Sequence, residues 1–139
     1  MAVKQKVFMD HSQPGSFQLT TRGQIVIARL IGDWDLPTTV AYFEQLKSLI
    51  LTVNYAPWGL MTDVRNWGVA CPEAYKQDME FVSWLSAKGL RYKAVLTHTQ
   101  QPFSVKKEYV PGFDLEEIHI FNQEKEAIDW LANKGIKGG

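Results

Sequence analysis

The stretch QIVIARLI, at residues 24–31, decides the fold. Apolar residues, most of them β-branched, fill every position except Gln24 and Arg29, so both faces of this segment need cover. Such a composition is typical of a central strand in a covered sheet. Just before it, FQLT at 17–20 alternates apolar and polar residues and runs into Arg22-Gly23. This pattern predicts an antiparallel edge strand joined through a tight hairpin turn.

Strands and helices alternate after residue 31. Asp35 and Pro37 suit a first helical turn, because aspartate caps free N–H groups and proline lacks the N–H that would be unpaired there. This helix is expected to bury a stripe made of Leu36, Val40, Phe43, Leu46, Ile50 and Val53. The other expected elements are strands at 58–64, 93–97 and 118–121, a loop at 65–70, a helix opening at 71–73 and a last helix capped by Asn122.

This alternation predicts an α/β fold. We expect a single mostly parallel sheet of about five strands, with an antiparallel edge strand and helices packed on it. The chain has 139 residues, 45% of them hydrophobic, which is enough for a core without disulfides. One domain over 1–139 is therefore expected, with 1–13 as an arm or extra strand and 135–139 as a frayed tail.

The composition argues against several function classes. The 15 basic and 15 acidic residues cancel, which disfavours a nucleic-acid partner. One cysteine, and three histidines without ligand spacing, predict neither a disulfide framework nor a metal site. No dinucleotide, P-loop or hydrolase motif occurs, so no cofactor is expected. No apolar run approaches the ~20 residues of a membrane span, and the first residues lack a signal-peptide stretch, which favours a cytoplasmic protein.

Four segments, in order between Phe17 and Lys134, carry a family resemblance. They are GDW at 32–34, LMTDVRNW at 60–67, GLRYKAV at 89–95, and IFN at 120–122 followed by AIDWL at 127–131. With them the chain resembles the SpoIIAA-like branch of the STAS superfamily, which is built on the fold of the anti-sigma-factor antagonists. The antagonists carry a phosphorylated serine at the start of the helix after the third strand. This chain instead reads GVACPE at 68–73, without a hydroxyl residue.

The resemblance also bears on function. The fold of this branch is similar to that of the CRAL-TRIO lipid-transfer domains, which implies an apolar ligand or a membrane surface. Ligands of open parallel sheets bind beyond the carboxyl ends of the strands. In the expected fold this edge collects Asp33, Trp34, Asp63, Arg65, Trp67, Cys71, His98 and Gln100. We expect the ligand-binding residues to be Trp34, Asp63, Arg65, Trp67, His98, Phe103 and Lys106, the last two from a flap at 102–110.

A structural alternative exists for the same residues. Asp63 and Arg65 would then form a local salt bridge, and Trp34 and Trp67 would close the core. Three functions stay open. The first is a non-enzymatic domain that binds an apolar or amphiphilic small molecule or lipid, with peripheral membrane contact. The second is a protein-interaction or regulatory module, including a homodimer. The third is an enzyme that uses Cys71 and His98, which the sequence favours least.

Overall fold

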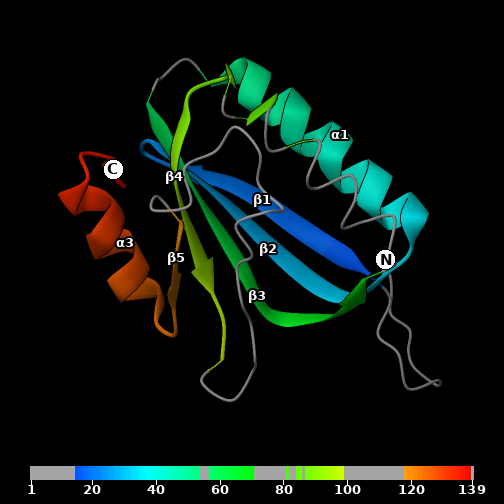
Figure 1. The fold of residues 1–139 in the computed structure, drawn as a ribbon. Helices are drawn as coiled ribbons and strands as arrows, with labels where there is room; N and C mark the ends of the chain where they lie inside the picture. Colours follow the sequence, from blue (N-terminus) through cyan, green and yellow to red (C-terminus); the bar gives the residue numbers. More distant parts are fainter. Residues whose placement is uncertain are drawn as a thin grey trace.

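The computed structural model describes residues 15–53, 57–70, 81, 84–85, 87–98 and 118–138. One five-stranded sheet forms its centre, with the strands in the order β1-β2-β3-β4-β5 (Figure 1). Only the β1–β2 pair is antiparallel; the other three pairs are parallel. The strands are β1 Ser16–Arg22, β2 Ile25–Trp34, β3 Trp58–Ala70, β4 Leu90–Leu96 and β5 Ile118–Phe121, and the helices are α1 Leu36–Thr52 and α3 Glu124–Asn133. The α/β fold with an antiparallel edge strand is confirmed.

The sheet separates two layers of core, and β2 contributes to both. Its residues Val26, Ala28 and Leu30 pack with α1 on one surface, here called the α1 face. Ile25 and Ile27 pack on the opposite surface with residues of α3, and this surface is the α3 face. Figure 1 shows the two helices on opposite sides of the sheet. The apolar composition of 24–31 is explained by this double cover.

Two predicted boundaries at the carboxyl ends of the strands are wrong. Residues 65–70 continue β3 rather than forming a loop, and β2 runs past Gly32 to Trp34. Gly32 has a φ of 73°, which only glycine adopts at little cost, and the β2–β3 register shifts beside it and again beside Asp63. These irregularities let both strands continue through a glycine and polar residues that are typical of a strand end.

The first helix begins as expected but presents a different face. The backbone N–H of Thr38 donates to Asp35 Oδ1 at 2.9 Å, which confirms the cap. The buried residues are Thr39, Tyr42, Leu46 and Ile50, whereas Leu36 and Val40 are 40% and 36% exposed. Thr39 tolerates burial because its hydroxyl donates to the Asp35 carbonyl at 2.8 Å. The predicted apolar stripe is therefore wrong at Leu36 and Val40, in the first turns of the helix, and correct at Leu46 and Ile50.

The C-terminal segment also differs from its prediction. Gln123, not Asn122, is the N-cap of α3, and the Asn122 amide instead donates to the carbonyl of Thr97. The expected fraying of 135–139 is not seen over the described residues 135–138. Ile136 is fully buried on the α3 face, and the Gln24 N–H donates to the Lys137 carbonyl at 2.7 Å. The buried Ile136 side chain and hydrogen bonds from Arg22 and Gln24 together hold this tail against the sheet.

Several predictions lie outside the described residues. They are the arm at 1–13, the helix opening at 71–73 and the flap at 102–110. Phe81, Trp84 and Leu85 are helical, and Leu85 is buried in the α1-face core. Gly89 has a φ of 103°, as expected of a residue that ends a helix. Within the part of the chain that the structure describes, no helix has the length and apolar character needed to cross a bilayer.

Replacing Ile27 by alanine should lower the free energy of unfolding by about 2–5 kcal/mol, because it leaves a cavity between β2 and α3. Urea denaturation followed by tryptophan fluorescence measures this. Leu51→Ala is the matched control, since Leu51 is 61% exposed and should change stability by only about 0.5 kcal/mol. Equal effects of the two substitutions would contradict the double cover of β2.

Candidate functional site

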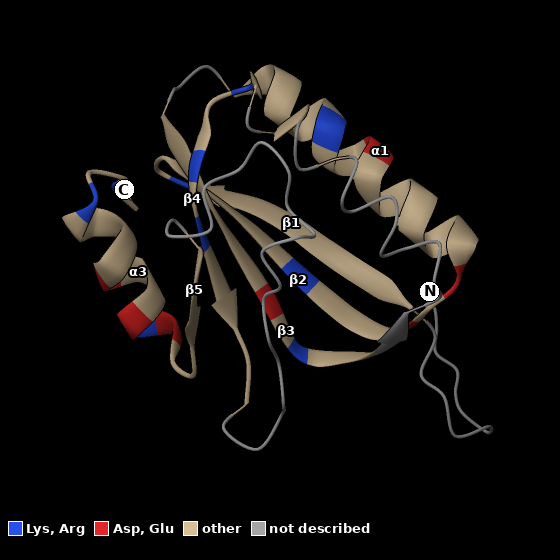
Figure 2. Cartoon of the chain, viewed as in Figure 1, with Lys and Arg blue, Asp and Glu red and all other residues tan. Residues whose placement is uncertain are grey.

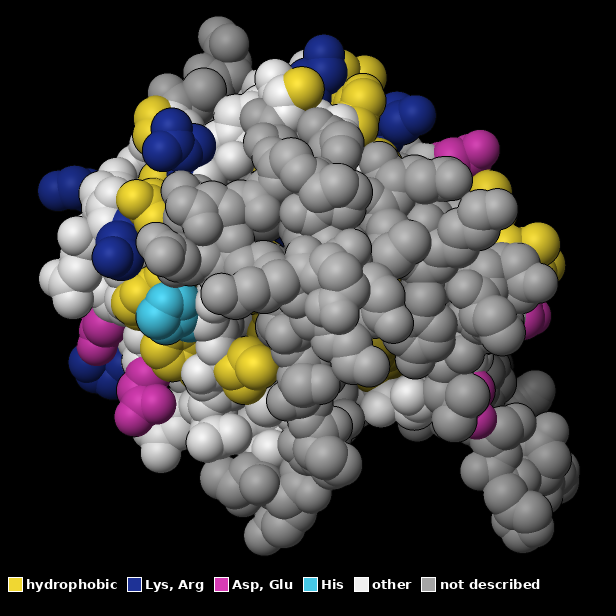
Figure 3. Space-filling view, viewed as in Figure 1, with side chains coloured by type: hydrophobic (Ala, Val, Ile, Leu, Met, Phe, Trp, Pro, Cys, Tyr) yellow, Lys and Arg dark blue, Asp and Glu magenta, His cyan; other side chains and the backbone are white. Residues whose placement is uncertain are grey.

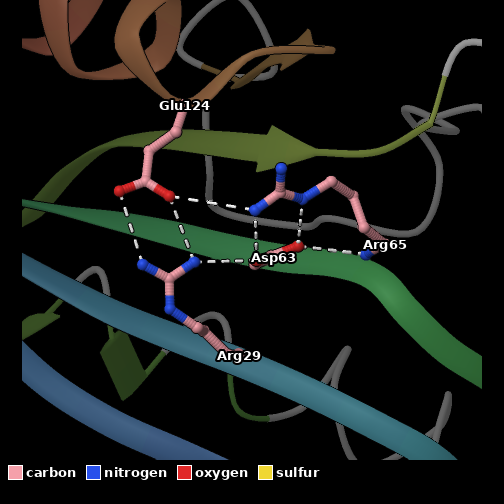
Figure 4. Close-up of polar contacts among 4 residues, drawn as sticks. All are labelled: Arg29, Asp63, Arg65 and Glu124. Carbon is pink, nitrogen blue, oxygen red and sulfur yellow. Dashed lines mark hydrogen bonds and ion pairs between the residues drawn. The ribbon is translucent and has the colours of Figure 1, made fainter.

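Four charged side chains form a cluster on the α3 face (Figure 4). Arg29 of β2 lies opposite Asp63 of β3 in the parallel register, and its Nη1 donates to Asp63 Oδ2 at 2.8 Å. Arg65 donates to the same carboxylate through Nε at 3.0 Å and Nη2 at 2.9 Å. Glu124, the first residue of α3, completes the cluster. Figure 2 shows that charged positions are few along the central strands β2 and β3.

Asp63 is the centre of the cluster and is only 4% exposed. A buried carboxylate is costly unless it is paired and hydrogen-bonded. Burial raises the pKa of Asp63, but the hydrogen bonds from the Arg65 side chain, the Arg65 backbone and Arg29 outweigh this and hold the pKa below its ordinary value. Asp63 is therefore ionised near neutral pH and fixes both guanidinium groups.

The local chain path brings Arg65 to this side of the sheet. Alternation alone puts Asp63 and the side chain two positions later on one face. The register shift places Asn66, instead of Arg65, opposite Ile31. Between these pairs β3 therefore has one residue more than β2, within Val64 and Arg65, and the Arg65 N–H donates to Asp63 Oδ1 at 3.0 Å. The shift re-aims the residues that follow, so that Asn66 lies beside Ile31 on the α3 face and Trp67 packs on the α1 face.

Glu124 is held more loosely than Asp63. Its two carboxylate oxygens lie 3.2 and 3.4 Å from the two terminal nitrogens of Arg29, and one oxygen lies 3.8 Å from Arg65 Nη2. The side chain of Glu124 is 35% exposed, against 5% for Asp63. Both arginine side chains are 32% exposed, so solvent reaches part of each of them.

The aromatic part of the predicted site belongs to the other face. Trp34 is buried at 5% exposure, and its indole N–H donates to the carbonyls of Ser16 and Ile31. Its ring meets that of Trp67 edge to face, with 5.6 Å between the centroids. Both side chains pack with the α1-face core. The structure thus brings Trp34 and Trp67 together, and Asp63 and Arg65 together, but on opposite sides of the sheet.

Both parts of the structural alternative are confirmed. Asp63 and Arg65 form a salt bridge, and the two tryptophans extend the core to the carboxyl ends of β2 and β3. His98 is exposed two residues after β4 ends. Phe103, Lys106, Cys71 and Gln100 lie outside the described residues.

Sequence reasoning missed Arg29 and Glu124. Arg29 did carry a signal, because it is the one charged residue within an otherwise apolar run and must find a partner when that run is buried. Glu124 had none beyond its place in the first turn of a predicted helix. Its contact depends on how α3 docks against β2 and β3, which is a tertiary relation between positions far apart in the chain.

A second group of rings lies where α3 meets β4 and β5. The Trp130 ring contacts His119 and Phe121, at centroid distances of 4.6 and 5.6 Å, and meets Tyr92 at 5.7 Å. Lys134 Nζ lies 5.9 Å from the Trp130 ring. Hydrophobic side chains reach the surface beside charged ones on this side of the molecule (Figure 3). Among the described residues no group of three or more side chains has the arrangement of a metal site.

The strand order, the single antiparallel edge and the helices on the two faces define an α/β domain with a SpoIIAA-like fold. A solved structure with this fold is similar to the chain: an uncharacterized protein from the DUF3478 family, from Shewanella loihica PV-4. The likeness has a TM-score of 0.60 and covers 91% of this chain and 99% of that one, at 12% sequence identity. No protein-family model and no curated protein matches the sequence. The fold expected from the resemblance is confirmed.

Replacing Asp63 by asparagine should lower the free energy of unfolding at neutral pH by about 3–5 kcal/mol, since two guanidinium groups lose a buried partner. The depressed pKa adds a pH signature. The stabilisation by Asp63 is complete above the ordinary carboxyl pKa and is lost as the pH falls through the lower folded value.

Wild-type stability should therefore fall on acidification below about pH 4, and the Asp63→Asn variant should lose less over the same range. Urea denaturation at a series of pH values measures both effects. Asp129→Asn, which breaks only an exposed pair with Lys125, is the control and should behave like the wild type. Parallel pH curves for Asp63→Asn and the wild type would contradict the assignment.

Proposed function

We propose that the protein is a non-enzymatic STAS-like domain that binds an amphiphilic small molecule, with the polar head of the ligand at Arg29 and Arg65. The observation that carries the proposal is the pair of partly exposed guanidinium groups fixed by one buried carboxylate. Guanidinium groups bind planar acidic heads through paired N–H donors, and fixing them beforehand reduces the entropy cost of binding.

The surroundings of the two arginines suit a bound head. On the neighbouring edge strand, Gln18 lies opposite Arg29 and is exposed. Ile31 follows on the same face and is partly buried, and Asn66 beside it is exposed. No helix within the described ranges covers β1 on this face. An open strip of polar side chains with one apolar residue therefore adjoins the cluster.

The apolar part of the ligand needs a wall on the same face. Trp34 and Trp67 pack on the opposite face, so in this proposal they stiffen the strand ends that carry Arg65 and do not line the ligand. Phe103 and Lys106 keep the roles expected from the sequence, an apolar wall and a basic rim, with His98 at the end of β4 as a further polar contact. Kinship of the fold with lipid-transfer domains supports an amphiphile as the class of ligand.

A protein-interaction module is the second candidate. It is favoured by the exposure of Leu36 and Val40, one turn apart on α1. Under this reading the α1 surface would contact a partner or a second copy, and replacing both residues by glutamine would lower the mass observed by analytical ultracentrifugation. An unchanged mass, with the wild type already monomeric, would leave the ligand-binding proposal ahead.

Titration with dansylated undecanoic acid tests the proposed function, with probe fluorescence as the measurement. The wild type should bind, and Arg65→Gln should bind about tenfold more weakly because one positive charge beside the head is lost. Arg91→Gln is the matched control, since Arg91 is exposed at the start of β4, at the other end of the sheet, and should bind like the wild type.

Near-ultraviolet circular dichroism should first show that both variants are folded. Native mass spectrometry of freshly purified protein gives an independent readout, because a retained ligand and the subunit count appear in one spectrum. Absence of probe binding by the folded wild type, or equal binding by Arg65→Gln and Arg91→Gln, would overturn the proposal.

A further inference from the structure

We infer that Glu124 is an internal competitor: its carboxylate occupies the seat on Arg29 and Arg65 that a carboxylate head of the ligand takes. The inference rests on the proposed function and names the class of head. In the structure the seat is formed by the two terminal nitrogens of Arg29, which face the two oxygens of Glu124, together with Arg65 Nη2 (Figure 4).

The two acidic residues of the cluster are bound very unequally. Asp63 accepts four hydrogen bonds of 2.8 to 3.0 Å and is buried, so removing it would leave two charges without their partner. Glu124 makes contacts of 3.2 to 3.8 Å and is partly exposed. Ion pairs at such exposure contribute little net free energy, because water and salt compete for them. Glu124 can therefore leave while Asp63 stays.

The charge of the cluster selects the head. Arg29 and Arg65 carry two positive charges and Asp63 carries one negative charge, so without Glu124 one positive charge remains. A carboxylate restores neutrality and matches the forked geometry of the guanidinium. A phosphate monoester carries between one and two negative charges near neutral pH, so its complex with the cluster would have an excess of negative charge. The vacant seat thus favours a monoanionic, planar head.

Replacement of Glu124 by a ligand should also affect the start of α3. Glu124 is the first residue of the helix, and the N-cap residue Gln123 makes no side-chain hydrogen bond to it. The next turns are held by Ala127 and Leu131, which are fully buried. Release of Glu124 should consequently loosen the first turn of α3 and leave the rest of the helix docked.

The test compares Glu124→Gln with Glu126→Gln. Both substitutions remove one negative charge from the first turn of α3, but only Glu124 contacts the arginines among the contacts described. Titration with dansylated undecanoic acid should show about threefold to tenfold tighter binding for Glu124→Gln than for Glu126→Gln, because a competing ion pair of exposed type is removed. Glu124→Ala removes the same carboxylate and serves as a second variant if Glu124→Gln folds poorly.

Four outcomes are separable. Tighter binding of the acid but not of its methyl ester by Glu124→Gln supports a carboxylate seat. Binding that depends on Arg65 but is the same in the two glutamine variants overturns this inference and leaves the proposed function standing. A larger gain for the phosphate monoester of the same chain than for the acid overturns the choice of head. Failure of every folded variant to bind overturns the proposed function itself.

Discussion

A strand with apolar side chains on both faces must be covered twice, and β2 meets this demand with α1 on one side and α3 on the other. Ile25 and Val26, adjacent in sequence, are both fully buried, each in a different core. The rest of the topology follows from that requirement. Parallel neighbours need long crossovers, and the helix of one such crossover provides the α1 cover, while the C-terminal helix and tail close the other face.

Arg29 is the one place where β2 departs from this pattern, and Asp63 is the consequence. A charged side chain at the centre of a covered strand needs a partner on the adjacent strand, and the parallel register supplies Asp63 directly opposite. The carboxylate then needs more than one donor, and the bulge at Arg65 provides the others. A local irregularity of β3 is thereby tied to the energetics of a buried charge.

Much of the fold could be predicted from periodicity and turn residues. The hairpin, the central strand, the cap at Asp35 and the short strand at 118–121 all depend on local patterns that short segments carry by themselves. The errors fall where local signals conflict with tertiary contacts. Gly32 and the polar residues 65–70 resemble a strand end, but pairing across two register shifts extends both strands. The tail at 135–138 has loop composition, yet the buried Ile136 and hydrogen bonds to Arg22 and Gln24 hold it against the sheet.

In the candidate site, too, local contacts could be predicted from the sequence and tertiary contacts could not. Asp63 and Arg65 could be paired from sequence because they are only two residues apart in the chain, whereas Arg29 and Glu124 come from other elements and meet only after the sheet and α3 have docked. Alternation already separates Trp34 from Arg29 on β2, but it would place Trp67 on the face of Arg65, two residues earlier. The register shift beside Asp63 turns Trp67 to the α1 face, and no local sequence signal announces that shift.

That alternation explains why the two faces can serve different ends. On the α1 face, buried side chains such as Trp34 and Tyr42 are held by ring contacts, and removing either one would open a cavity. On the α3 face, Glu124 is partly exposed and would exchange with a ligand in our proposal, while the buried Asp63 keeps the arginines in place. The sheet lies between the charged cluster and the aromatic side chains. In the proposal, replacing Glu124 by a ligand would therefore leave the packing around Trp34 unchanged. A domain that must hold its shape while its polar face changes partners needs this separation of a rigid layer from an exchangeable one.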